Sequence, residues 1–160
     1  MRYTILSLLI LCSFAGCQTT PTKITPPFQT VSPDQSTLDE ATGKRWYDAQ
    51  TLDIEGQGWT TNLKHPYDRL PAKAEGVVRA PVWNLSTHSA GLQVRFTTDS
   101  PTIAARWDLR EANLAMPHMP STGVSGLDLY TRDDKGQWRF VGAGSPKKQN
   151  GNEVSLVNGA

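Results

Sequence analysis

The sequence has few cysteines, little net charge and no long hydrophobic run beyond its first residues. Cys12 and Cys17 are the only cysteines among 160 residues, so the chain after them contains no disulfide framework. Lys and Arg total 16 against 15 Asp and Glu, which leaves a net charge of +1. This balance argues against a nucleic-acid-binding protein, because such proteins carry a clustered basic excess. After the N-terminus no apolar stretch is long enough to predict a membrane span.

The first 16 residues have the pattern of a signal peptide. Arg2 is the only charge before Cys17, and the apolar run over residues 5–15 suits a signal h-region but is too short to span a bilayer. The run ends in Phe-Ala-Gly-Cys, which resembles a bacterial lipobox. This resemblance implies cleavage before Cys17, acylation of that residue and attachment to a membrane, and Gln18 implies delivery to the outer membrane. An ordinary secretory signal, with export to the periplasm, is the alternative.

Residues 17–45 have the composition of a lipid-anchored flexible linker. Threonine is frequent there, no hydrophobic period is sustained, and four prolines interrupt any helix: Pro21, Pro26, Pro27 and Pro33. We expect a disordered, partly extended spacer that holds a folded domain away from a membrane. A capping-box-like pattern from Thr37 to Glu40 predicts one short helical turn within residues 34–41.

Residues 46–160 have the pattern of an all-β domain. Short runs of alternating apolar and polar residues are separated by Gly, Pro, Asn and Asp, and about seven such strands suit a jelly-roll-like antiparallel β-sandwich. Residues 91–98 and 102–109 are predicted to pair as an antiparallel hairpin. Residues 127–131 and 137–141 are predicted to pair as a second hairpin around an Asp-Asp-Lys-Gly turn.

The remaining runs are shorter. We expect weaker strands at residues 46–47, 52–54, 77–79 and 82–85. Only residues 108–115 have a helical composition, and Pro117 ends that run. Residues 153–157 predict a last strand, followed by the turn residues Asn158-Gly159-Ala160. A sandwich that ended there would leave a strand edge unpaired, so we expect the chain to be the front part of a longer protein.

The sequence contains no recognisable catalytic motif. It has neither a Gly-x-Ser-x-Gly elbow nor a Gly-Asp-Ser start, and its three histidines lie outside any triad signature. Met116, His118 and Met119 combine two thioethers with an imidazole, which is a ligand set that suits Cu(I). A methionine-rich loop that packs on an aromatic ring is the commoner use of such residues. We therefore predict no metal and no cofactor.

The five tryptophans are compatible with a second function, the binding of carbohydrate. Exposed aromatic rings of exported β-sandwiches can stack on pyranose rings, and Trp59 is the best candidate for an exposed ring, although a packing role is commoner. Trp107 and Trp138 lie in alternating runs, and we predict that both belong to the core. A stand-alone carbohydrate- or surface-binding lipoprotein is therefore the alternative function.

The run Ser125-Gly126-Leu127-Asp128-Leu129-Tyr130 carries a family resemblance. It is accompanied by further matching segments at residues 46–49, 69–71, 82–86, 90–92, 95–100 and 116–119. Together they resemble the GxDLY domain, a β-sandwich that precedes the catalytic domain of SGNH (GDSL-like) hydrolase-type esterases. The resemblance covers about residues 46–157. It implies a catalytic partner domain that carries the Ser, Asp and His of the reaction and hydrolyses acyl or acetyl esters, such as those of acylated carbohydrate. This chain would then be the accessory domain, inactive alone.

The motif also predicts a contact surface. Gly126 allows either the close approach of a neighbour or a positive φ. Asp128 and Tyr130 share one face of a strand and could hydrogen-bond the Met116–Thr122 loop, while the leucines of the motif point to the core. We hypothesise that this loop packs against the catalytic domain; alternatively, Asp128 only stabilises a local turn. The candidate interdomain or ligand contacts are Met116, His118, Met119, Gly126, Asp128, Tyr130 and Trp59.

Overall fold

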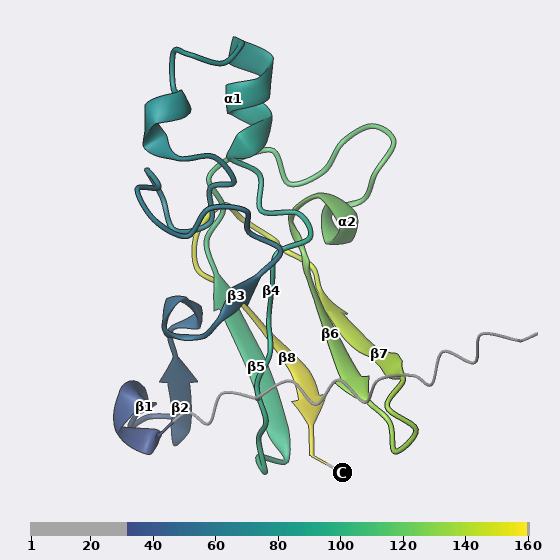
Figure 1. Cartoon of the computed structure of the whole chain (residues 1–160). Helices are drawn as coiled ribbons and strands as arrows, with labels where there is room; N and C mark the ends of the chain where they lie inside the picture. The colour runs from purple at the N-terminus through teal and green to yellow at the C-terminus, as the bar shows by residue number, and fades with distance from the viewer. Residues whose placement is uncertain (1–31, 160) are drawn as a thin grey trace, which may run out of the picture. The chain divides into compact units, whose positions relative to one another are not determined.

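The structure is a computed structural model that describes residues 32–159 (Figure 1). The predicted signal peptide, Cys17 and the first part of the linker lie outside these residues. The chain divides into two compact units, Met1–Phe96 and Thr97–Ala160, which we describe separately as unit 1 and unit 2. No helix within residues 32–159 is long and apolar enough to cross a membrane.

The predicted all-β class is confirmed. Strands outnumber helices, and every strand pairing in the described part of the chain is antiparallel. The pairs are β1–β2, β3–β4, β5–β8 and β6–β7. Because the strands pair two by two, each sheet is smaller than those of the jelly-roll-like sandwich that the sequence predicts.

The described part of unit 1 begins with a short hairpin that overlaps the predicted linker. After a 3-10 turn, η1 (Pro33–Gln35), strand β1 (Ser36–Asp39) pairs with β2 (Lys44–Tyr47). Asp39 closes the turn, since its carbonyl accepts a hydrogen bond from the Gly43 N–H at 2.7 Å. The predicted helical turn at Thr37 is therefore wrong. Cross-strand pairing supplies the backbone partners there, and this outweighs a local capping pattern.

The second sheet of unit 1 joins segments that lie far apart in sequence. Strand β3 (Ile54–Glu55) pairs with β4 (Gln93–Val94). The Glu55 carboxylate accepts a hydrogen bond from Gln93 Nε2 at 2.8 Å and forms an ion pair with Arg95 at 2.7 Å. The predicted hairpin of residues 91–98 with 102–109 is therefore wrong, because β4 takes β3 as its partner.

Three more short helical segments lie in the described part of unit 1: η2 (Ala49–Thr51), η3 (Ala72–Ala74) and α1 (Ala80–Ser86). The strand predicted at residues 82–85 is wrong because these residues belong to α1, where Pro81 occupies the first turn. Proline is favoured there because its fixed φ suits a helix start and its missing N–H is not needed. Residues 77–79, predicted as a strand, lie in the turn before α1.

Unit 2 contains the other two sheets. Strand β5 (Thr102–Trp107) pairs with β8 (Asn152–Asn158), with a register shift between Ile103 and Ala104. The predicted terminal strand is thus confirmed, and it is paired with β5. Residues 108–115 contain no helix, contrary to the prediction. The Leu109 N–H instead donates to the Gln149 carbonyl at 2.8 Å, so a long-range contact replaces a helical bond.

The hairpin that the sequence predicts around residues 133–136 is confirmed. Strand β6 (Leu127–Arg132) pairs with β7 (Trp138–Gly144), with a register shift between Leu129 and Tyr130. The Asp133 carboxylate accepts the Gln137 N–H at 2.8 Å and the Arg139 Nε–H at 2.9 Å. The hydrogen bond from the Gln137 backbone lowers the pKa of Asp133 most, and the one from Arg139 lowers it further below its usual value.

Burial is unusual in the described residues. None of their hydrophobic side chains is buried, whereas the polar residues Asp68, Ser86 and Asn152 are, and Asp68 is fully buried. Trp138 is 49% exposed, so the prediction that it belongs to the core is wrong. Leu127 pairs with Gly144 and lies on the face predicted for it, but at 37% exposed it is not buried. A two-stranded sheet has too little surface to enclose large side chains on both of its faces.

Candidate functional site

The first residue of the Gly-x-Asp-Leu-Tyr motif lies where two backbone segments meet. Gly126 follows helix α2 (Ser121–Ser125) directly and has an extended backbone with φ −86°. A Cβ at this position would lie 2.6 Å from the Gly144 carbonyl oxygen, and it would also overlap the backbone of Thr122. Of the two roles that the sequence allowed, close approach is therefore correct and positive φ is not.

A second glycine, Gly144, makes a close contact with the neighbouring β5–β8 sheet. A Cβ at Gly144 would lie 2.8 Å from Val154 Cγ1 and 3.0 Å from the Trp107 ring. The Trp107 Nε1–H donates to the Ser125 carbonyl at 3.1 Å, so the indole connects β5 to the end of α2. Gly126 thus lets the end of α2 lie against β7, and Gly144 lets the β6–β7 hairpin lie directly against the β5–β8 sheet.

The outer face of the β6–β7 hairpin carries the polar residues of the motif. Asp128, Tyr130 and Arg132 alternate along β6, and their partners on β7 are Ala143, Phe140 and Trp138. The Tyr130 and Phe140 rings meet edge to face, with centroids 5.6 Å apart and an angle of 71°. The Arg132 guanidinium lies 5.7 Å from the centre of the Trp138 ring. The motif therefore presents an aromatic and charged surface.

The Met116–Thr122 loop contains a tight turn. The backbones of Met116 and Met119 exchange two hydrogen bonds, of 2.9 and 3.1 Å, which leaves Pro117 and His118 at the tip. Both methionines are exposed, at 45% and 39%. The Met119 side chain lies close to Gly123, where a Cβ would be 3.0 Å from Cγ. The loop is thus held by its own backbone and by α2.

The contacts of this loop with the motif strand differ from the prediction. The described residues show no hydrogen bond from Asp128 or Tyr130 to the loop; the Tyr130 ring packs on Phe140 instead. The start of α2 is attached to the end of β7 through the hydroxyls of Ser121 and Ser145, 2.8 Å apart. No group of three or more His, Cys, Asp or Glu in residues 32–159 is placed to hold a metal ion.

Trp59, the predicted sugar-binding candidate, is 50% exposed in unit 1. Gln57 holds the loop that carries Trp59 in place. Its side-chain amide donates hydrogen bonds to the carbonyls of Pro66 and Asp68, both at 2.8 Å. Tyr67 lies between these two residues, and its pKa is raised, chiefly by burial and further by the nearby charge of Asp48. Its phenol therefore stays protonated at neutral pH.

Asp68 is a residue that sequence reasoning missed. Its side chain is only 1% exposed, and its Oδ2 accepts the backbone N–H of His65 at 3.0 Å. The following residue, Arg69, donates its backbone N–H to the carbonyl of Ser86 at the end of α1. Asp68 thus organises the turn that Arg69 attaches to the end of α1. Its only sequence signal was its position directly before the family segment at residues 69–71.

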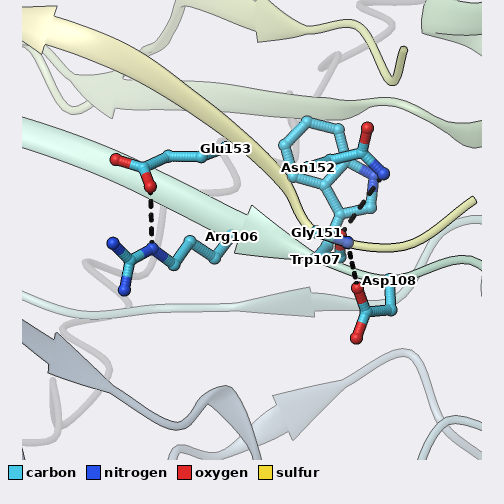
Figure 2. Close-up of a pocket in the computed structure, with 6 residues that line it drawn as sticks. All are labelled: Arg106, Trp107, Asp108, Gly151, Asn152 and Glu153. Carbon is cyan, nitrogen blue, oxygen red and sulfur yellow. Dashed lines mark hydrogen bonds and ion pairs between the residues drawn. The ribbon is translucent and has the colours of Figure 1, made fainter. Parts of the chain in front are cut away.

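Unit 2 also contains an open pocket of about 310 Å³ (Figure 2). It is lined by Arg106, Trp107, Asp108, Gly151, Asn152 and Glu153. Its charged groups already have partners: Arg106 Nε lies 2.8 Å from Glu153 Oε2, and Asp108 accepts the Gly151 N–H. The pocket therefore lies at the end of the β5–β8 sheet where these contacts hold the two strands together.

Asn152, which the sequence analysis also did not identify, holds the loop before β8 in place. It is 5% exposed, and its Oδ1 accepts the backbone N–H groups of Lys147 and Lys148 at 2.9 and 3.3 Å. Its Nδ2 donates to the Lys148 carbonyl at 2.8 Å. A buried side-chain amide thus replaces the sheet partners that this loop lacks.

Comparison with known proteins establishes the relationship that the motif suggested. The GxDLY family model, described as the N-terminus of SGNH hydrolase-type esterases, matches residues 44–160. The chain belongs to the GxDLY family. The matched range contains the close backbone contact at Gly126, the inter-sheet contact at Gly144, the outer face of β6–β7 and the Met116–Thr122 loop, so these are features of a GxDLY domain. The comparisons with curated proteins and with solved structures found no match.

Proposed function

We propose that this GxDLY domain is a non-catalytic accessory domain of an exported SGNH-type esterase. A catalytic SGNH domain would hydrolyse acyl or acetyl esters, and the GxDLY domain would support it. The family match carries this proposal, because GxDLY is the N-terminal part of such esterases. The buried polar residues agree with it: Asp68 and Asn152 use their side chains to bind backbone groups, which is a structural role.

The Met116–Thr122 loop is the proposed contact with the catalytic domain. Its two backbone hydrogen bonds hold the turn in one shape, so little conformational entropy is lost when a partner binds. The exposed thioethers of Met116 and Met119 are flexible and polarisable, and they can adapt to an irregular apolar partner surface.

Binding in trans tests this function. The full chain is mixed with the catalytic domain of an SGNH esterase from which its own GxDLY domain has been removed, and calorimetry measures the affinity. We expect saturable binding, and the double variant Met116→Ser/Met119→Ser should bind about tenfold more weakly because it loses two apolar contacts. Lys73→Ala, at an exposed position of unit 1, should bind like the wild type. No binding of the wild type, or hydrolysis of an activated acetate ester by the chain alone, would contradict the proposal.

The alternative function has one supporting observation, the half-exposed ring of Trp59. A stand-alone carbohydrate-binding protein would bind a soluble glycan saturably with quenching of tryptophan fluorescence, and Trp59→Ala would abolish both effects. That result, together with no affinity for an SGNH catalytic domain, would favour the alternative.

We further propose export and acylation of Cys17, supported by the short apolar run and the lipobox-like residues before it. In a bacterial host fed with labelled palmitate, the chain should incorporate the label. Cys17→Ser should lose it completely, whereas Cys12→Ser, which changes the other cysteine, should keep it. Equal labelling of the wild type and Cys17→Ser would disprove acylation at this residue.

A further inference from the structure

The outer face of the β6–β7 hairpin combines exposure with an unusual composition. The exposed fractions of Tyr130, Trp138 and Phe140 are 50%, 49% and 59%. Arg132 lies over the Trp138 ring, and Asp128 is exposed at the other end of the same face. Isolated exposed aromatics are common, but three on one face of a hairpin mark an interaction surface.

We propose that this outer face is the principal docking surface for the SGNH catalytic domain, with the Met116–Thr122 loop as a smaller contact. The inference rests on the proposed accessory function and assigns it to particular side chains. Tyr, Trp and Arg are the residues most enriched among those that dominate the energy of protein interfaces. All three types occur here, and none of the paired residues of this face is a lysine, a type that interfaces disfavour.

The geometry of the rings favours a folded protein as the occupant. Tyr130 and Phe140 meet at 71°, so they form a stepped surface that is poorly suited to the flat stacking of a sugar ring. Arg132 and Asp128 carry opposite charges, whereas a face that binds anionic lipid would be uniformly basic. Aromatic anchors flanked by both charge signs fit a partner surface with pockets and complementary charges.

The size of the face agrees with a domain interface. An aromatic side chain buries about 150–250 Å² when fully covered, so three half-exposed rings offer roughly 300 Å². An interface between domains of one chain buries about 600–1,500 Å² over both sides. The aromatic face therefore supplies about one side of a small interface.

The outer face can be changed without touching the face of the hairpin that packs on the β5–β8 sheet. The opposite face contains Gly142 and Gly144, which lie against Leu156, Val154 and Trp107 of the other sheet. Tyr130 and Phe140 contact each other across the outer face, and threonine at both positions keeps the β-propensity of the strands. The double variant Tyr130→Thr/Phe140→Thr is thus a direct test.

In the assay with the truncated esterase, we expect this double variant to bind about thirtyfold more weakly or worse, as for the loss of two central interface residues. The matched control is Val77→Thr/Leu85→Thr, which removes two exposed apolar side chains from unit 1, 82% and 68% exposed. Its affinity should change less than about twofold, since isolated exposed apolar residues carry little binding energy.

Hydroxyl-radical footprinting of the wild-type chain gives a second measurement that needs no variant. Oxidation of Tyr130, Trp138 and Phe140 should fall when the catalytic domain is present. If the wild type binds but neither the double variant nor the footprint changes, the docking face is wrong and the accessory function stands. If the wild type does not bind, both proposals fail. Protection of these rings by a soluble glycan and not by the catalytic domain would also overturn the inference.

Discussion

Gly126→Ala is expected to lower the free energy of unfolding of unit 2 by about 3 kcal/mol, or to prevent its folding. The new methyl group would lie 2.6 Å from the Gly144 carbonyl oxygen and would overlap the backbone of Thr122. Backbone atoms cannot rotate away as a flexible side chain can, so α2 or strand β7 would have to move. Urea unfolding of the full chain, followed by circular dichroism and tryptophan fluorescence, measures the change.

Gly142→Ala is the matched control because it adds the same methyl group in the same hairpin. A Cβ at Gly142 would lie 3.6 Å from the Leu156 carbonyl oxygen, which is an ordinary van der Waals contact. Its effect should stay within about 0.5 kcal/mol, as for other unstrained substitutions. Equal stability of the two variants would show that the close approach at Gly126 is not what requires glycine in the motif.

Asp68→Ala is expected to destabilise unit 1 by about 2–4 kcal/mol. The side chain is 1% exposed, and its Oδ2 accepts the His65 N–H at 3.0 Å. Alanine would leave the partly buried His65 N–H without its acceptor and would also create a cavity. The turn would loosen beside Arg69, which connects it to α1. Thermal and urea unfolding of the full chain would detect the loss.

Two further variants separate the role of the acceptor from that of the charge. Asp68→Asn keeps a side-chain oxygen and should cost about half as much as alanine or less. Glu40→Ala removes an exposed carboxylate from the same unit and should change stability by less than about 0.5 kcal/mol. A wild-type unfolding curve for Asp68→Ala would refute the structural role of this carboxylate.

Local patterns in the sequence were sufficient where the partners are neighbours. The hairpin of β6 and β7 follows from two alternating runs around an Asp-Asp-Lys-Gly turn, because the turn itself brings the strands together. The two-residue period also places Asp128 and Tyr130 on one face. That Phe140 and Trp138 share this face depends on the register shift after Leu129, which no local pattern indicates.

The pairings between distant segments could not be read in the same way. Residues 91–98 and 102–109 look like two arms of a hairpin, yet β4 pairs with β3 and β5 pairs with β8. Alternation shows which side chains share a face but contains no information about which strand supplies the hydrogen bonds. For the same reason the sequence did not indicate Asp68 and Asn152, because their partners are backbone groups that only the folded loops bring within reach.

The all-β class, the family and the two faces of the motif strand could be predicted without the structure, because composition, a specific motif and a period of two are local properties. The reason why the motif begins with glycine, and the identity of the aromatic rings beside Tyr130, emerged from the folded chain. Both answers depend on contacts between separate segments, at Gly144 for the glycine and at β7 for the rings. Such contacts are determined by the packing of whole sheets and not by the residues on either side in the chain.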